Sequence, residues 1–360
     1  MSYARRIAAL FLALLCTAGA LSCHAAGPSV SAAAYVLMDA DSGRVLLAEN
    51  AERELPVAST TKIMTALVAL QDGDLTKVCT VRQEHLARGS SMYLAAGETL
   101  TLEDLLYGLL LSSGNDAAEC IADNCGGRAS FIRRMNDTAA ALGMTHTSFA
   151  NPSGLDEAGH YSCALDMARL MTAAMRDPVF ARIASTATAS AAARSMTNHN
   201  RLLNAAVGCV GGKTGYTDAA GRTLVTCAER EGLRLVAVTL HDRNDWNDHE
   251  ALYDYGFSTY RREILLARGS ACAVVPVRGG GVSFVALKVA DTLSCALAEG
   301  ETAELCFALE ETAAAPVRAG EKLGEAIVRV DGAELGRVPL TAANDVTIAA
   351  VKASGFRMRG

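Results

Sequence analysis

The segment Cys209–Asp242 reads CVGGKTGYTDAAGRTLVTCAEREGLRLVAVTLHD and decides the expected fold. Its runs CVGGKTGYT, GRTLVTCAER and LRLVAVTLHD are rich in Val, Leu and Thr, as strands are, and short turns separate them. Further upstream, Ala33–Asn50 holds two apolar runs around Asp41-Ser42-Gly43, which predicts a β-hairpin. We expect the hairpin and the later strands to form one antiparallel sheet.

The spacing of apolar residues is helical between about residues 100 and 184, in the segments TLEDLLYGLLL, DAAECIADNC, ASFIRRMNDTAAALG and CALDMARLMTAAM. One more helix is expected after the strands, at about residues 247–262. A hairpin, a helical block, a strand meander and a closing helix together predict an α+β domain. In this domain, helices cover the antiparallel sheet and the helical block forms a subdomain.

The character of the chain changes after about residue 263, where short alternating runs such as ACAVVPVR, VSFVALKV and EAIVRVDG are split by turns. This pattern predicts a small all-β domain at the C-terminus. The expected organisation is a first domain over residues 27–262 and a second domain over residues 263–360.

The N-terminus has the pattern of a secretory signal peptide over residues 1–26. Arg5 and Arg6 precede an apolar run from Ile7 to about Leu15, and small residues follow. A membrane anchor is one alternative, although the apolar run is short for a span, and a lipid-modified Cys23 is another. In each case we expect the functional part of the chain to lie outside the cytoplasm, in the cell envelope.

The composition is that of a globular, multi-domain protein, with 360 residues of which 51% are hydrophobic and 20% charged. The formal net charge is -6, and the sequence has no run of basic residues of the kind that binds nucleic acid. We therefore assign no nucleic-acid partner. The 11 cysteines show no CxxC pairs and no Cys and His pairs at ligand spacing. We therefore assign no disulfide pairing, leave the presence of disulfides open, and expect no metal site.

The stretch Pro56–Leu67, PVASTTKIMTAL, places a serine and a lysine at the start of an apolar helix. Three residues apart, the side chains of Ser59 and Lys62 lie about 60° apart on one helical face, close enough to touch. A capping serine beside a solvated lysine is the simpler interpretation. However, a cation at a helix N-terminus is unfavourable by about 0.3–1 kcal/mol, whereas a neutral amine there is not.

Two further short motifs follow along the chain. Ser113-Gly-Asn115 interrupts two helical segments, which fits either plain helix caps or a hydroxyl and an amide presented to a substrate. Lys213-Thr214-Gly215 lies on the first strand of the meander. Its lysine is either a solvated edge residue or a cation for a substrate carboxylate, and its glycine permits close approach of an extended peptide.

Together, S-x-x-K, S-x-N and K-T-G form the ordered set of penicillin-binding proteins and class A β-lactamases. From about Ala32 to its end, the sequence resembles the serine D-alanyl-D-alanine carboxypeptidases, which are low-molecular-mass penicillin-binding proteins. Further landmarks of this family are NPSGLD (151–156), GHYS (159–162), DMA (166–168), NHNRLL (198–203), KTGYT (213–217) and GAELGRVPL (332–340). Two features depart from the family pattern: Gly114 in the second motif, and a tail over residues 350–360 too short for an anchoring amphipathic helix.

The resemblance implies a β-lactamase/transpeptidase-like fold and removal of the terminal D-alanine from peptidoglycan stem peptides ending in D-Ala-D-Ala. It implies no cofactor, β-lactam antibiotics as inhibitors, and an oxyanion hole formed by two backbone N–H groups. It leaves association with the membrane open. The implied catalytic residues are Ser59, Lys62 and Ser113. The implied substrate-binding residues are Asn115, Lys213, Thr214, Gly215, Tyr216 and Arg243.

Two other functions remain as alternatives. A β-lactamase would share the three motifs, but class A enzymes deacylate with a loop glutamate, and Ala158–Met167 contains none. A non-catalytic penicillin-binding sensor would keep the pocket and lose a motif residue, and no motif residue is missing here.

Overall fold

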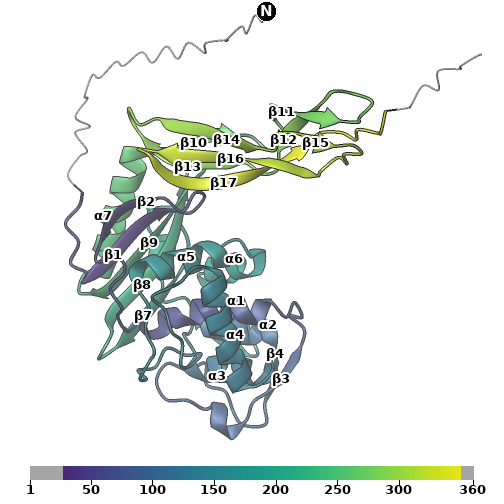
Figure 1. Cartoon of the computed structure of the whole chain (residues 1–360). Coiled ribbons are helices and arrows are strands. Elements are labelled where there is room, and N and C mark those ends of the chain that lie inside the picture. Colours follow the sequence, from purple (N-terminus) through teal and green to yellow (C-terminus); the bar gives the residue numbers. More distant parts are fainter. Residues whose placement is uncertain (1–26, 350–360) are drawn as a thin grey trace, which may run out of the picture.

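The computed structural model describes residues 27–349, so the expected signal peptide and the short tail lie outside the described residues. Within this range the chain forms a domain of sheet and helices, and an elongated all-β domain lies across one end of it (Figure 1). The predicted α+β class and the additional all-β domain are both confirmed.

A five-stranded antiparallel sheet, with the strand order β2-β1-β9-β8-β7, forms the centre of the first domain. The hairpin strand β1 pairs with the last meander strand β9, so the two ends of the domain meet inside the sheet. The predicted meander strands are confirmed at their expected positions. The strands are β1 (Ala34–Asp39), β2 (Val45–Glu49), β7 (Cys209–Thr217), β8 (Gly221–Arg230) and β9 (Leu233–Asp242).

Helices cover both faces of the sheet, α7 on one side and the helical block with α5 on the other (Figure 1). Successive side chains of β1 point to opposite faces of the sheet. Val36 therefore belongs to the core under α5, and Leu37 belongs to the core under α7. The helices are η1 (Ala58–Thr61), α1 (Lys62–Leu70), η2 (Gln83–His85), α2 (Leu102–Leu110), α3 (Asn115–Asn124), α4 (Arg128–Ala141), α5 (Ala164–Ala174), α6 (Pro178–Ala184), η3 (Arg201–Asn204) and α7 (Asp245–Thr259). Two short two-stranded sheets accompany them, β3 (Val78–Thr80) with β4 (Thr99–Thr101) and β5 (Thr188–Ala191) with β6 (Arg194–Thr197).

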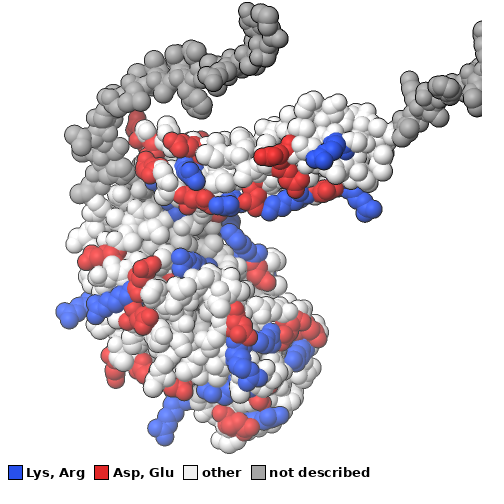
Figure 2. All heavy atoms as spheres, viewed as in Figure 1, with Lys and Arg blue, Asp and Glu red and all other residues white. Residues whose placement is uncertain are grey.

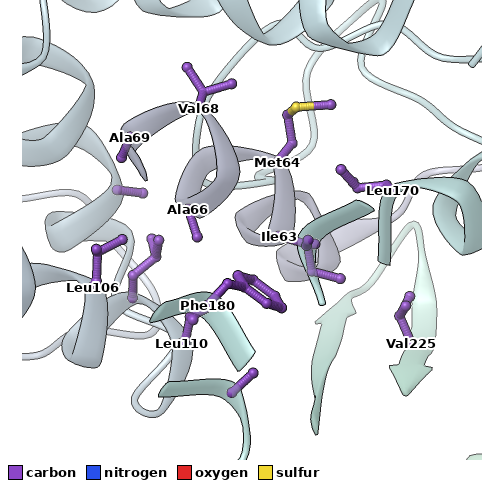
Figure 3. Close-up of a cluster of buried hydrophobic side chains, with 14 of the residues drawn as sticks. Ile63, Met64, Ala66, Val68, Ala69, Leu106, Leu110, Leu170, Phe180 and Val225 are labelled. Atoms are coloured by element: carbon purple, nitrogen blue, oxygen red, sulfur yellow. The ribbon is translucent and has the colours of Figure 1, made fainter. Parts of the chain in front are cut away.

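Helix α1 runs through the middle of the larger core. Its side chains Ile63, Met64 and Ala66 are fully buried and lie among side chains of several other elements, including Leu110 and Phe180 (Figure 3). A helix that is apolar on nearly all sides is stable only when it is surrounded in this way. The packing therefore fixes the position of the turn that precedes α1, which carries Ser59.

The closing helix differs from its prediction at its C-terminal end. It covers Asp245–Thr259, and the residues from Tyr260 onward form a strand instead of continuing the helix to residue 262. In this strand Tyr260 pairs with Ala298, so tertiary pairing decides the local structure. The expected domain boundary after residue 262 falls inside β10, and it remains a proposal.

The C-terminal domain consists of strands throughout its described part. Its main sheet has six strands in the order β14-β16-β17-β12-β11-β15, and β10 pairs separately with β13. Buried Val and Leu side chains alternate with exposed residues along β11 and β12, as the sequence pattern predicts. The strands are β10 (Tyr260–Leu266), β11 (Ala271–Arg278), β12 (Phe284–Val289), β13 (Leu293–Ala298), β14 (Ala303–Leu309), β15 (Ala313–Ala314), β16 (Lys322–Val330) and β17 (Ala333–Ala342).

The β1–β2 hairpin connects the two domains through polar contacts. The Arg44 guanidinium forms an ion pair of 2.6 Å with Glu301 and donates a hydrogen bond to the Ala296 carbonyl. The backbone N–H of Ala296 in turn donates to the carboxylate of Asp39 at 2.9 Å. Because these groups are mostly buried, the hairpin holds the all-β domain in a defined place against the first domain.

The surface carries charges of both signs, and on the face in Figure 2 red and blue side chains are interspersed over both domains. In residues 27–349, no helix combines the length and the apolar character needed to cross a membrane. The cysteines described there are all free thiols.

Candidate active site

Ser59 lies in the short turn η1, directly before helix α1. The preceding Ala58 has a φ of 47°, a left-handed conformation that residues with a side chain rarely adopt. Ser59 borders an open cavity of about 650 Å³, which Ser113 and Thr214 also line. All three sequence motifs thus contribute a residue to one cavity.

The amine of Lys62 is fully buried and lies among three oxygen atoms. Its Nζ is 2.8 Å from Ser59 Oγ, 2.7 Å from Asn115 Oδ1 and 2.6 Å from the carbonyl oxygen of Ser153. An amide oxygen and a backbone carbonyl can only accept hydrogen bonds. In a neutral amine these two acceptors take both hydrogens, so the lone pair is left for the hydroxyl of Ser59.

The surroundings of Lys62 favour the neutral amine. Burial lowers the pKa of Lys62 well below its usual value, and the positive charge of Lys213 lowers it further. The carboxylates of Asp116 and Glu119 act in the opposite direction with smaller effect. The lysine that sequence reasoning expects as a base therefore lies where the unprotonated form is stabilised.

Asn115 is oriented by its contacts with the segment before helix α2. Its Nδ2 donates to the Arg88 carbonyl at 2.7 Å, and its backbone N–H donates to the Ser90 carbonyl at 2.8 Å. Because the amide nitrogen is held in this way, the amide oxygen points to Lys62. Ser113 has a φ of 58°, and its hydroxyl has no hydrogen-bond partner among the described residues.

The unusual Gly114 has a local explanation. A Cβ atom there would lie 2.7 Å from a carboxylate oxygen of Asp116 and 3.2 Å from the backbone nitrogen of Met92. That carboxylate accepts hydrogen bonds from the backbone N–H groups of Met92 and Leu94. The glycine therefore leaves room for a carboxylate that orders the segment facing the second motif.

The contact of the Ser153 carbonyl with Lys62 was not predicted from the sequence, although NPSGLD is a family landmark. Gly154 has a φ of 86°, and a Cβ atom there would overlap with the carbonyl group of Ala58. A backbone carbonyl, as at Ser153, has no side-chain signature. The glycine beside it is the available signal, because glycine permits such close approach of two backbones.

His160 connects the loop that contains Ser153 and Gly154 to the turn η1. Its Nδ1 accepts the Ala150 N–H at 3.1 Å, so its Nε2 carries the hydrogen and donates to Thr61 Oγ1 at 2.8 Å. Burial lowers the pKa of His160 to about 4, so the ring is neutral near pH 7. The loop and the turn are thus joined next to the Lys62 amine.

Lys213 lies on strand β7 and is almost completely buried, and its Nζ donates to the Thr214 carbonyl at 2.8 Å. Burial lowers its pKa to about 7. At Gly215 a Cβ atom would lie 2.9 Å from the backbone nitrogen of Ser59, so glycine lets the strand approach the nucleophile closely. Tyr216 follows and lines the cavity.

Arg243 is the one predicted site residue that the structure does not bring to the others. Strand β9 ends at Asp242, and Arg243 follows it as an exposed residue outside the lining of the cavity. Its role in substrate binding stays a prediction. Arg201 and Arg222 also line the cavity. Arg201 belongs to the landmark NHNRLL but was given no role in the sequence analysis, and Arg222 was not predicted.

The described residues contain no group of three or more His, Cys, Asp or Glu side chains placed to hold a metal ion.

Two family comparisons fit this geometry. Residues 22–244 match the family described as D-alanyl-D-alanine carboxypeptidase, and residues 260–347 match the family described as penicillin-binding protein 5, C-terminal domain. The D-alanyl-D-alanine carboxypeptidase DacF of Bacillus subtilis is 33% identical over 341 residues, with 89% of this chain and 86% of that protein covered. For DacB2 of Mycobacterium tuberculosis the identity is 38%, over 64% of this chain and 84% of that protein.

The solved structures agree with the sequence comparisons. Penicillin-binding protein 5 from Haemophilus influenzae superposes with a TM-score of 0.77 at 28% identity, covering 89% of this chain and 98% of that one. The chain therefore belongs to the D-alanyl-D-alanine carboxypeptidase family, and its fold is that of penicillin-binding protein 5. The resemblance inferred from the motifs is confirmed.

The close approach at Gly154 leads to a first prediction. Gly154→Ala should sharply reduce acylation of Ser59 by penicillin, because the added methyl group pushes the loop away from Ala58 and so moves the Ser153 carbonyl from Lys62. Gly159→Ala is the matched control, since Gly159 is also left-handed, with a φ of 80°, but has open space around it. Equal acylation rates in the two variants would contradict this explanation.

The buried Lys213 leads to a second prediction. Its pKa is about 7 in the folded chain and about 10.4 when unfolded, so between these values the unfolded state binds more protons. Lys213 should therefore make the free energy of unfolding rise with pH in this window, by at most about 1.4 kcal/mol per pH unit. Urea denaturation from pH 7.5 to 9.5 should show a smaller slope for Lys213→Met. An unchanged slope would mean that Lys213 keeps its proton when folded.

Proposed function

We propose that the protein is a serine-type D-alanyl-D-alanine carboxypeptidase that removes the terminal D-alanine from peptidoglycan stem peptides. Ser59 would be the nucleophile, and penicillin would acylate the same hydroxyl. The observation that carries this proposal is the position of the Lys62 amine, 2.8 Å from Ser59 Oγ with two acceptors for its hydrogens. A serine hydroxyl needs such a base to act as a nucleophile.

In the first step, the amine of Lys62 takes the proton of Ser59 Oγ while this oxygen attacks the carbonyl carbon between the two D-alanines. Negative charge then develops on the carbonyl oxygen. The backbone N–H groups of Ser59 and Tyr216 are proposed to stabilise it, which is worth about 3–4 kcal/mol per donor in comparable hydrolases. The close approach of β7 at Gly215 to the Ser59 nitrogen supports this arrangement.

In the second step, the bond to the leaving D-alanine breaks and its nitrogen needs a proton. Ser113 lines the cavity and has a hydroxyl free to donate, and the proton on Lys62 replaces the one that Ser113 gives up. D-alanine leaves, and water then hydrolyses the ester on Ser59. Asn115 holds the substrate amide, while its own amide oxygen keeps Lys62 in place.

The substrate backbone is proposed to lie along β7. This strand is at the edge of the five-stranded sheet, so its outer N–H and C=O groups are available to an extended peptide. Thr214, Gly215 and Tyr216 lie where that peptide would pass, and Lys213 adds positive potential beneath Thr214. With export by the N-terminal signal peptide, this chemistry would take place in the cell envelope.

Replacement of the nucleophile is the direct test of this function. Ser59→Ala should abolish both the mass increase of the protein after benzylpenicillin and the release of D-alanine from a pentapeptide, because no other hydroxyl in residues 27–349 contacts the Lys62 amine. The fold should persist, since no core volume is lost. Ser185→Ala, at the exposed end of α6, is the control. A Ser59→Ala protein that still releases D-alanine would refute the mechanism, and fast penicillin hydrolysis without D-alanine release would indicate a β-lactamase.

The role of Lys62 as a base gives a further prediction. Lys62→Arg keeps the positive charge but cannot be neutral near pH 7, so acylation should fall by about 10²–10⁴. In the unaltered protein, acylation should rise with pH as Lys62 loses its proton, and this rise should be missing in Lys62→Arg. Lys213→Arg is the control for added bulk at a buried lysine, and it should retain more activity than Lys62→Arg. Equal losses with unchanged pH profiles would mean that Lys62 is not the base.

A further inference from the structure

Asp116 is a buried carboxylate to which the proposed proton transfers assign no role. It is the second residue of helix α3 and is 1% exposed. Its Oδ1 accepts the backbone N–H of Met92 at 3.0 Å and that of Ala117 at 2.9 Å. Its Oδ2 accepts the Ser91 hydroxyl at 2.6 Å and the Leu94 N–H at 3.1 Å. Because all four partners donate, the group fits an ionised carboxylate, and no cation in residues 27–349 forms an ion pair with it.

The carboxylate holds the segment that orients Asn115. Three of its four hydrogen bonds come from residues 91–94, which lie just after Arg88 in the chain. The Arg88 carbonyl accepts a hydrogen bond from Asn115 Nδ2 at 2.7 Å, and Asn115 Oδ1 lies 2.7 Å from the Lys62 amine. Asp116 therefore anchors the segment on which the alignment of the Asn115 amide with Lys62 depends.

The Lys62 amine needs a nearby negative charge once it has acted as a base. It is neutral before it takes the proton of Ser59 and positive afterwards, and it stays buried throughout. Burial and the charge of Lys213 disfavour the positive form, whereas Asp116 favours it. His160, which contacts the turn η1, is neutral near pH 7 and adds no charge. Without a compensating negative charge, the buried amine would be a weak base.

The other charged groups in this region have partners of their own. Glu119, three residues further along α3, also favours the positive form of the amine, but it forms an ion pair of 2.8 Å with Arg128. Arg194 senses the charge of Asp116, and it forms an ion pair of 2.7 Å with Glu98. Of the two acids that act on the amine, Asp116 has the larger effect and is not bound to a cation in the described part of the chain.

We propose that Asp116 is a positioning residue of the reaction, which aligns Asn115 and supplies the negative charge that stabilises Lys62 in its protonated form. The assignment rests on the proposed function, because it concerns the same proton transfer. In that step the O–H bond of Ser59 breaks and an N–H bond forms on Lys62, while Asp116 neither gains nor loses a proton. Its charge is already in place when the positive charge appears, so no reorganisation is needed.

The test measures the rate of acylation by benzylpenicillin against pH in variants of helix α3. Asp116→Asn removes the charge and turns an NH2 group toward two of the four donors. Its rate at high pH should fall about tenfold or more, because Lys62 becomes a weaker base and Asn115 is displaced. Its rise with pH should also move to lower pH, because Lys62 loses its proton more easily. Asp116→Glu keeps the charge and disturbs the hydrogen bonds, so its rate should fall while the rise stays at the original pH.

Two further variants separate charge from position. Glu119→Gln leaves every hydrogen bond of Asp116 intact, so it should shift the rise to lower pH by less than Asp116→Asn and keep the rate at high pH within twofold. Asp123→Asn is the matched control at the other end of α3, and it should change neither the rate nor the position of the rise. Circular dichroism of each variant checks that the fold persists.

Three results would overturn the assignment. The first is an Asp116→Asn protein that acylates at the original rate, and the second is one that is slower but rises at the original pH. The third, which decides the matter if Asp116→Asn does not fold, is an Asp116→Glu protein with an unchanged rate or a shifted rise. A protein that released no D-alanine would refute the proposed function. Acylation by benzylpenicillin, or an NMR titration of Lys62 in Asp116→Asn, would still test the role of Asp116.

Discussion

The buried amine of Lys62 is the group on which the rest of the site depends. It joins three parts of the chain, because its partners Asn115 and Ser153 lie 53 and 91 residues further along the sequence. Burial of an amine is costly unless its hydrogens find acceptors. The helical core around α1 and the loop over residues 151–154 provide both the burial and the acceptors. Lys62 can therefore act as a base only when these elements are correctly assembled.

Two residues close to this amine have a strained backbone. Ala58 and Ser113 both have left-handed φ angles, 47° and 58°, and both adjoin proposed catalytic groups. Conformations of this kind cost about 1–3 kcal/mol each and persist only where the surrounding packing imposes them. Here the apolar contacts of α1 and the close fit of Gly154 against Ala58 impose them. In these conformations Ser59 and Ser113 both line a common cavity.

The sequence predicted those features that leave a local pattern. Strands β7 to β9 were predicted within their observed limits, because their composition and turns are distinctive, and the Ser59–Lys62 contact followed from helical spacing. Partners brought together only by tertiary structure were not predictable. The Ser153 carbonyl has no side-chain signature, and three of the donors around Asp116 lie 22 to 25 residues earlier in the sequence. Arg243 lies one residue beyond strand β9, which ends at Asp242, and its role in the site stays a prediction.

The central claim is that Lys62 is neutral at the pH at which the enzyme works, and its protonation can be observed directly. The protein, with ¹³C label at the lysine Cε atoms, would be titrated by NMR, and Lys62→Met would identify the signal. We predict a transition well below pH 10.5, followed by no further change at higher pH. A signal that shows a charged amine up to pH 10 would contradict the account, because Ser59 would then have no base beside it.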